Sequence, residues 1–185
     1  MNNYSLPTSL EIDGIEYRIR TDFRDIINIM VALGDPDLDD EAKAYVFFMV
    51  FFIDPVPPPL RGAAMEAGFE FINGGMKSDN RPAPKLLDWE QDAPLIMPAV
   101  NKVAGKEVRS LDYLHWWTFL GYYMEIGESQ FSTVVGIRQK LSKKKKLETY
   151  EKEYYRQNKE TVDLKKKISS DELDALNELV GWSDT

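Results

Sequence analysis

Three aspartates lie two residues apart in an acidic loop, which is the spacing of the first ligands of a calcium-binding loop. Asp35, Asp37 and Asp39 match its positions one, three and five. Position six, where such loops need glycine for a sharp turn, is Asp40, and position twelve, usually a bidentate glutamate, is Val46. We therefore expect a solvated loop whose charges stabilise the start of the next helix, and no metal site.

Side chains that could carry out catalysis are sparse. The chain has no cysteine and a single histidine, His115, which lies in an apolar stretch with no serine or acid at a spacing that suggests a triad. We interpret His115 as a histidine satisfied in the core or at its boundary. No phosphate-binding or dinucleotide-binding glycine motif is present. The sequence predicts no catalytic residue and no cofactor, so we expect a protein that is not an enzyme.

A basic segment could bind phosphates. Residues 138–167 hold 12 basic and 5 acidic side chains, a net charge of +7, in a chain whose formal net charge is -8. One interpretation is nucleic-acid binding by these cations and the tyrosines between them. We favour a solvated helix with glutamate–lysine pairs, such as Glu148 with Lys152, because acidic residues interleave with the basic ones.

The same segment carries a narrow apolar stripe. Leu147, Tyr150 and Tyr154 are spaced three and four residues apart, with Tyr155 beside them. Such a stripe is too narrow for a core of its own but wide enough to dock in a groove. These four residues are one candidate partner-binding surface.

A β-hairpin is predicted near the N-terminus. Two alternating apolar and polar runs are separated by Asp13-Gly14, a dipeptide that favours a type I′ turn. An isolated hairpin is marginally stable, so helices or a strand of another chain must cover it. Ile15, Tyr17 and Ile19 are the second candidate partner-binding surface.

The rest of the chain is predicted to be mainly α-helical. We expect helices over 41–53, 60–73, 88–104, 129–141 and 147–161, a helix capped by Thr21 that ends at Gly34, one over 111–126 capped by Ser110, and a last one capped by Ser169 that bears Leu173, Leu176 and Leu179. This arrangement predicts a helical core domain with the hairpin over residues 1–141, and a charged helical appendage over residues 142–185.

The charge is distributed unevenly over 185 residues. Residues 1–100 have a net charge of -9, whereas residues 101–185 have +1. The longest apolar run, Ala44–Ile53, would cover roughly 15 Å as a helix, about half of a bilayer. The first ten residues, MNNYSLPTSL, have neither the basic nor the apolar region of a secretory signal, so we expect none. We expect a cytoplasmic protein that does not enter membranes.

Several stretches together resemble a phage protein family. They are LPTSLEIDGIEYRIRTDFRDI, FINGG, KLLDWEQDAPLI, VRSLDYLHWWTFLGYYMEIGES, FSTVVGIRQK and YRQNK followed by VDL. Over about residues 5–164 the chain resembles the bacteriophage gene-product-fifteen family of tailed phages and prophages of Gram-positive bacteria. The resemblance implies a tail-module gene placed between those of the major tail protein and the tape measure protein, and expression in the cytoplasm of such a host.

That position is usual for tail assembly chaperones, which cover the tape measure protein before the tail tube forms. The resemblance therefore implies a non-enzymatic chaperone whose partner is the tape measure protein, with self-association along a filament as an option. The alternatives are a permanent virion component, such as a tail or head–tail connector protein, and an accessory protein that binds nucleic acid through residues 138–167.

Overall fold

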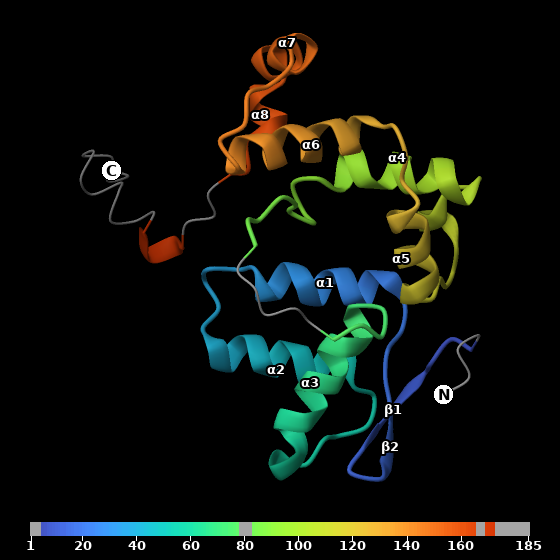
Figure 1. The fold of residues 1–185 in the computed structure, drawn as a ribbon. Helices are drawn as coiled ribbons and strands as arrows, with labels where there is room; N and C mark the ends of the chain where they lie inside the picture. The colour runs from blue at the N-terminus through green and yellow to red at the C-terminus, as the bar shows by residue number, and fades with distance from the viewer. Residues whose placement is uncertain (1–4, 78–82, 166–168, 173–185) are drawn as a thin grey trace, which may run out of the picture.

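The computed structural model describes residues 5–77, 83–165 and 169–172, and within them the chain is mainly helical with one antiparallel hairpin (Figure 1). The strands and helices follow one another in the order β1 (Ser9–Ile12), β2 (Ile15–Arg18), α1 (Phe23–Leu33), α2 (Asp40–Phe51), η1 (Pro58–Leu60), α3 (Arg61–Ile72), α4 (Ala93–Ala104), η2 (Val108–Ser110), α5 (Trp116–Met124), α6 (Gln130–Ser142), α7 (Thr149–Gln157) and α8 (Lys159–Val162).

The predicted hairpin is confirmed. β1 pairs with β2 so that Ile12 lies opposite Ile15, and the two turn residues, Asp13 and Gly14, both have positive φ angles of 52° and 75°. These are the angles that a type I′ turn needs. Along the outer side of β2, Ile19 forms a bridge with Phe52, so the segment after α2 covers part of that edge.

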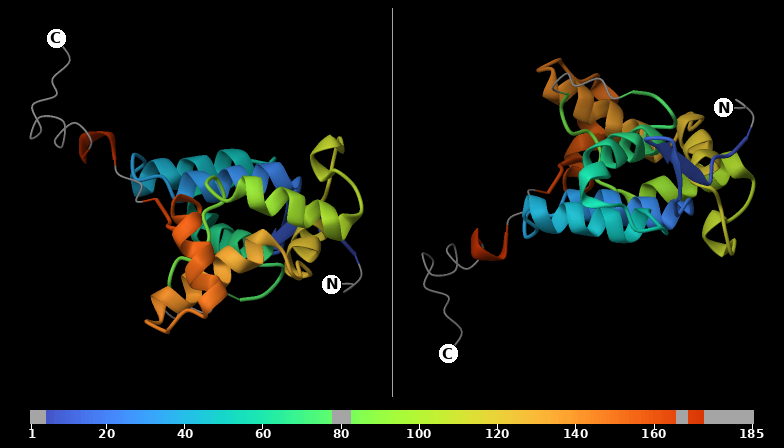
Figure 2. Two further views of the ribbon diagram at one scale, coloured as in Figure 1. Left: turned by 90° about the horizontal axis from the view of Figure 1, so that it is seen from above. Right: turned by 90° about the horizontal axis from the view of Figure 1, so that it is seen from below.

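Two helical layers meet around the main hydrophobic core. α1 and α2 lie side by side, with α3 and the hairpin packed beneath them in the view of Figure 1. α4 and α6 form the upper layer, and α5 connects it to α1 (Figures 1 and 2). The aromatic rings of Phe47, Phe51 and Phe71 are buried at the centre of the lower layer. An added Cβ at Gly68 would lie 2.5 Å from Phe47 Cζ, so only glycine lets α3 approach α2 this closely.

Two predicted helix starts were wrong for a shared reason. Asp22, not Thr21, caps α1, and its carboxylate also accepts from the Leu114 amide at 3.0 Å. Ser110 does not start α5, which begins at Trp116 after His115. The chain before α5 is extended because Asp22 and His115 form a β-bridge, in which Phe23 N donates to Leu114 O at 3.0 Å. Backbone pairing between distant segments therefore takes the place of the helical start that the sequence predicts after Ser110.

The start of α4 also differs from the prediction. Asp88 accepts from the amides of Glu90 and Gln91, as a cap does, but these residues form a turn and α4 begins at Ala93. Pro94 occupies the first turn of α4, where proline is tolerated. The helices predicted over 41–53, 60–73 and 129–141 are confirmed with small shifts. Most of the predicted last helix, with its three leucines, lies outside the described residues, although the capping box of Ser169 and Glu172 is present.

A buried ion pair connects the upper layer to the C-terminal segment. Arg138 on α6 binds Asp92 with two hydrogen bonds, of 2.6 Å and 2.9 Å, and the two side chains are only 5% and 1% exposed. The remaining donors of the Arg138 guanidinium reach the carbonyl oxygens of Leu86, Thr161 and Val162. All five N–H groups of Arg138 are therefore satisfied, and α8 is held against α6.

Removal of the arginine should destabilise the fold strongly. In Arg138→Met the buried Asp92 carboxylate loses its partner, so we expect the free energy of unfolding in urea to fall by about 3–5 kcal/mol. The double variant Arg138→Met with Asp92→Asn has no charge at this pair and keeps an oxygen that can accept from the Asp88 amide, so it should recover part of this loss. A loss below about 1 kcal/mol in the single variant would contradict the central role of this ion pair.

Candidate partner-binding site

The structure places two of the three candidate hairpin residues in the core. Tyr17 is 6% exposed and packs edge to face against Phe52, and Ile19 is 3% exposed. Only Ile15, at 52% exposed, faces solvent. The expectation that all three form a partner surface is therefore corrected, because α3 and the segment after α2 already cover that face of the hairpin.

The second candidate stripe also contributes mostly to the protein's own packing. Leu147, Tyr154 and Tyr155 are half-buried against the small core formed by α6 and α8, and the Tyr155 hydroxyl donates to Asp163 at 2.8 Å. Tyr150 points away and is 67% exposed. Of these four residues, Tyr150 alone leaves its side chain open to a partner.

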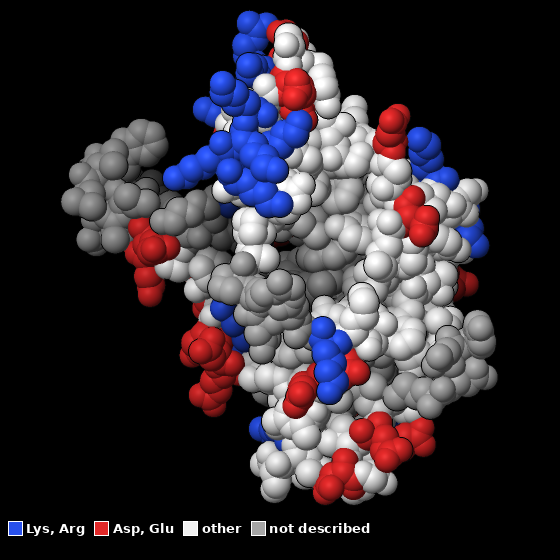
Figure 3. Space-filling view, in the orientation of Figure 1, with Lys and Arg blue, Asp and Glu red and all other residues white. Residues whose placement is uncertain are grey.

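The basic segment is divided between internal ion pairs and free charge. Arg138 is buried, Lys140 binds Glu151 at 2.7 Å, and Arg156 binds Glu153 at 2.7 Å. The hydrogen bond from Lys140 lowers the pKa of the Glu151 carboxyl. The exposed positive charge gathers at Lys143–Lys146, where Figure 3 shows blue side chains between the end of α6 and α7.

His115 has a structural role. Its Nδ1 accepts from the Trp117 amide at 3.0 Å and so caps α5, which leaves the proton on Nε2, 2.9 Å from the Pro7 carbonyl oxygen. The ring is 3% exposed, and burial lowers the pKa of His115 below its usual 6.5. Both ring nitrogens are thus satisfied, as the sequence interpretation expects.

The acidic loop serves as a set of caps. Asp39 accepts from the Ala42 amide at 2.7 Å and starts α2, and Asp35 accepts from the Asp37 amide at 2.9 Å. Asp37 in turn accepts from the amide and hydroxyl of Ser170. In the part of the chain that the structure describes, no group of three or more histidine, cysteine or acidic residues could hold a metal ion.

An apolar groove that the sequence analysis missed lies between α1, the end of α3 and α5. It has a volume of about 440 Å³. We call it the methionine groove, and the described residues that line it are Met30, Ile72, Asn73, Met76, Lys77, Trp89, Trp116, Leu120 and Met124. Met76 and Met124 on its rim are 57% and 63% exposed. The residues come from four separate segments, so no local spacing in the sequence could reveal the groove.

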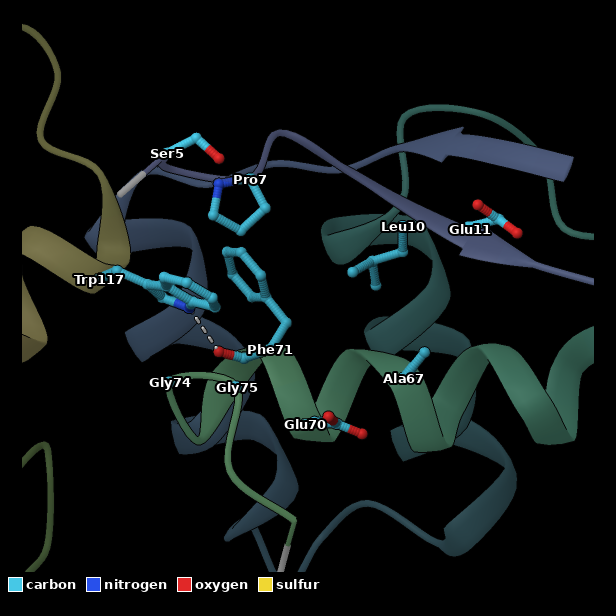
Figure 4. Close-up of a pocket in the computed structure, with 10 residues that line it drawn as sticks. All are labelled: Ser5, Pro7, Leu10, Glu11, Ala67, Glu70, Phe71, Gly74, Gly75 and Trp117. Carbon is cyan, nitrogen blue, oxygen red and sulfur yellow. Dashed lines mark hydrogen bonds between the residues drawn. The ribbon is translucent and has the colours of Figure 1, made fainter. Parts of the chain in front are cut away.

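A second groove lies on the other side of α3 (Figure 4). This hairpin groove has a volume of about 510 Å³, and its lining consists of Ser5, Pro7, Leu10, Glu11, Ala67, Glu70, Phe71, Gly74, Gly75 and Trp117. Glu11 on β1 and Glu70 on α3 are its only charged lining residues among those that the structure describes.

Two adjacent tryptophans separate the grooves. The indole N–H of Trp116 donates to Ile72 O at 2.8 Å. The indole N–H of Trp117 donates to Phe71 O at 2.9 Å, as Figure 4 shows. These carbonyls end α3 and lack a partner within the helix. Gly74 follows with a φ of 71°, and a Cβ there would approach Leu120 to 3.0 Å. The FINGG and HWW stretches therefore meet at one place and build one wall of each groove.

Comparison with known proteins gives one match. A family model described as Bacteriophage Gp15 protein matches residues 3–164. No curated protein and no solved structure gives a significant match. Among the described residues, the helices are too short or too polar to cross a membrane.

The two tyrosines of α7 should respond differently to truncation. Tyr154→Ala removes half-buried packing against α6 and α8, so we expect it to lower the free energy of unfolding by about 1–3 kcal/mol. Tyr150→Ala changes an exposed ring and should stay within about 0.5 kcal/mol of the parent chain. Urea denaturation followed by tryptophan fluorescence measures both values, and equal effects would contradict this division of the stripe.

The single histidine should make stability depend on pH. Because burial lowers the pKa of His115, the unfolded chain binds more protons than the folded chain below about pH 6.5. The contribution of His115 to the free energy of unfolding is complete above about pH 6.5 and is lost as the pH falls through the lowered pKa. We expect the free energy of unfolding to decrease from about pH 7 to about pH 5, and this slope should flatten in His115→Asn, which keeps a capping oxygen. An unchanged slope in the variant would assign the pH dependence to carboxyl groups.

Proposed function

The chain belongs to the bacteriophage Gp15 protein family, and on that premise we propose that it is a tail assembly chaperone that binds the tape measure protein during tail morphogenesis. Family membership supports the broader assignment to phage structure or morphogenesis. In this proposal the protein acts by reversible binding and not by catalysis.

The methionine groove is the observation that carries the proposal. Exposed apolar patches on a soluble chain mark interaction sites, and here two methionines are more than half exposed beside buried tryptophan. Methionine is flexible and polarisable, so a surface rich in it can bind apolar helices of different sequence. A chaperone that covers successive segments of one long helical chain needs such tolerance.

The partner's chemistry fits this groove. A tape measure protein is a long and largely helical chain with apolar stripes, which would aggregate unless they were covered. An amphipathic helix buries such a stripe by laying it in a groove with anchors three and four residues apart. The acidic body of this chain, with a net charge of -9 over residues 1–100, would keep the complex soluble.

Charged substitutions on the rim of the groove should weaken binding. Met76→Glu with Met124→Glu places two carboxylates where apolar contact is needed, so we expect at least about tenfold weaker retention of a co-expressed tape measure protein. Met49→Glu is the matched control, because Met49 is also 57% exposed but lies on α2, outside the groove. Both proteins should unfold at the temperature of the parent chain.

Two results would overturn the proposal. One is a parent chain that neither keeps the tape measure protein soluble nor forms a complex with it. The other is mass spectrometry of purified particles that finds the protein at a fixed copy number, since a chaperone leaves before the virion is complete. That second result would favour a permanent virion component.

A further inference from the structure

Opposite charges lie at opposite ends of the molecule. The basic loop Lys143–Lys146 follows α6 at the top of Figures 1 and 3, and the hairpin is at the bottom, where acidic side chains gather. Glu11, Asp13 and Glu16 of the hairpin are exposed, as are all four lysines. Within the described residues no carboxylate lies within ion-pair distance of any of these lysines.

The acidic end carries an unfavourable pair that a cation would relieve. Glu11 lies directly opposite Glu16 in the register of β1 and β2, and like charges in directly opposed positions destabilise a hairpin. Glu70 adds a third carboxylate across the hairpin groove from Glu11. The nearby Arg18 does not compensate, because it is bound to Asp54 by hydrogen bonds that lower the pKa of that carboxyl to about 2.

The same end has a free strand edge. Ile12 and Ile15 flank the two-residue turn as a hydrogen-bonded pair, and such pairs alternate along an antiparallel ladder. The amides and carbonyls of Leu10 and Ile12 therefore point toward β2. Glu11, between them, turns its backbone groups outward, and no other described strand pairs with that side of β1. The edge borders the hairpin groove, which can receive an extended segment whose lysine stems lie along its apolar lining while their ammonium groups reach the carboxylates.

The α6–α7 loop has the matching chemistry. Lys143–Lys146 carry four consecutive positive charges, and the backbone leaves the helix at Lys144, whose φ is 53°. Residues 145–148 have no helix or strand assignment, so the loop presents its lysines on an irregular segment that can extend. α6 and α8, which flank the loop and α7, are held in place by the Arg138–Asp92 ion pair.

We propose that the hairpin end of one chain binds the Lys143–Lys146 loop of a second copy. The two surfaces are different and lie at opposite ends, so each bound copy leaves one free surface of each kind. The contact is therefore heterologous and joins chains head to tail, in contrast to an isologous dimer in which the same surface is used twice. This inference does not depend on the tape measure protein, because it requires only the chain itself.

The test uses two complementary variants of the full chain. Glu11→Lys with Glu16→Lys blocks the acidic end, and Lys145→Glu with Lys146→Glu blocks the basic loop. Sedimentation velocity at about 0.01 M salt, where the Debye length is about 30 Å, should show concentration-dependent association of the parent chain and its loss at about 1 M salt. Each variant alone should associate at least about tenfold more weakly.

A mixture of the two variants is decisive. One variant retains the basic loop and the other retains the acidic hairpin, so each can contribute one intact surface to a single contact. Equimolar mixing should therefore give a heterodimer through the intact pair of surfaces, and hence association that neither variant shows alone. Lys102→Glu with Lys106→Glu serves as the matched control, because these lysines lie outside the loop, and it should associate as the parent chain does.

Three outcomes would overturn the proposal. The parent chain could remain monomeric at every salt concentration, or the mixture could fail to form the heterodimer although both variants are folded by circular dichroism. The third is a parent chain that stays monomeric but binds a duplex oligonucleotide through Lys145 and Lys146, which would assign the loop to nucleic acid.

Discussion

The ion pair between Arg138 and Asp92 determines where four segments of the molecule meet. Removing two charges from water is costly, and the pair is tolerated only because every donor of the guanidinium finds an acceptor. Those acceptors are on the loop before α4, on Asp92 itself and on α8. The geometry of one side chain therefore fixes α4, α6 and the C-terminal segment relative to one another, and with them the position of the basic loop between α6 and α7.

Lysine could not replace this arginine, and the same difference explains how the basic segment is divided. Arginine has a planar head with five donors that suits burial, whereas the lysine ammonium is strongly hydrated and stays near water. In the segment 138–167 the arginine at 138 is buried, and Lys143–Lys146 are exposed. The described cations of the segment are thus one buried structural arginine, two in ion pairs with glutamates, an exposed cluster of four lysines and a few scattered exposed lysines.

The sequence predicts most of what local chemistry determines. The Asp13-Gly14 turn, a helix that begins near Ser129 and the end of α1 at Gly34 follow from short-range rules, and the structure has them. It did not predict that residues 111–115 lie outside a helix, because the bridge between Asp22 and His115 forms across the fold. It also could not tell which candidate residues face a partner, since Tyr17 and Tyr154 are covered by segments distant in the chain. The methionine groove was missed for the same reason.

Both grooves depend on how α3 ends. The indoles of Trp116 and Trp117 satisfy the last carbonyls of that helix, so α5 must begin beside it, and Gly74-Gly75 lets the chain turn away without a clash. Because the two tryptophans are adjacent near the start of one helix, one contributes to the methionine groove and the other to the hairpin groove. A partner that moved α5 away from α3 would alter both grooves together. The end of α3 and the start of α5 therefore fix the shape of both grooves through one pair of adjacent residues.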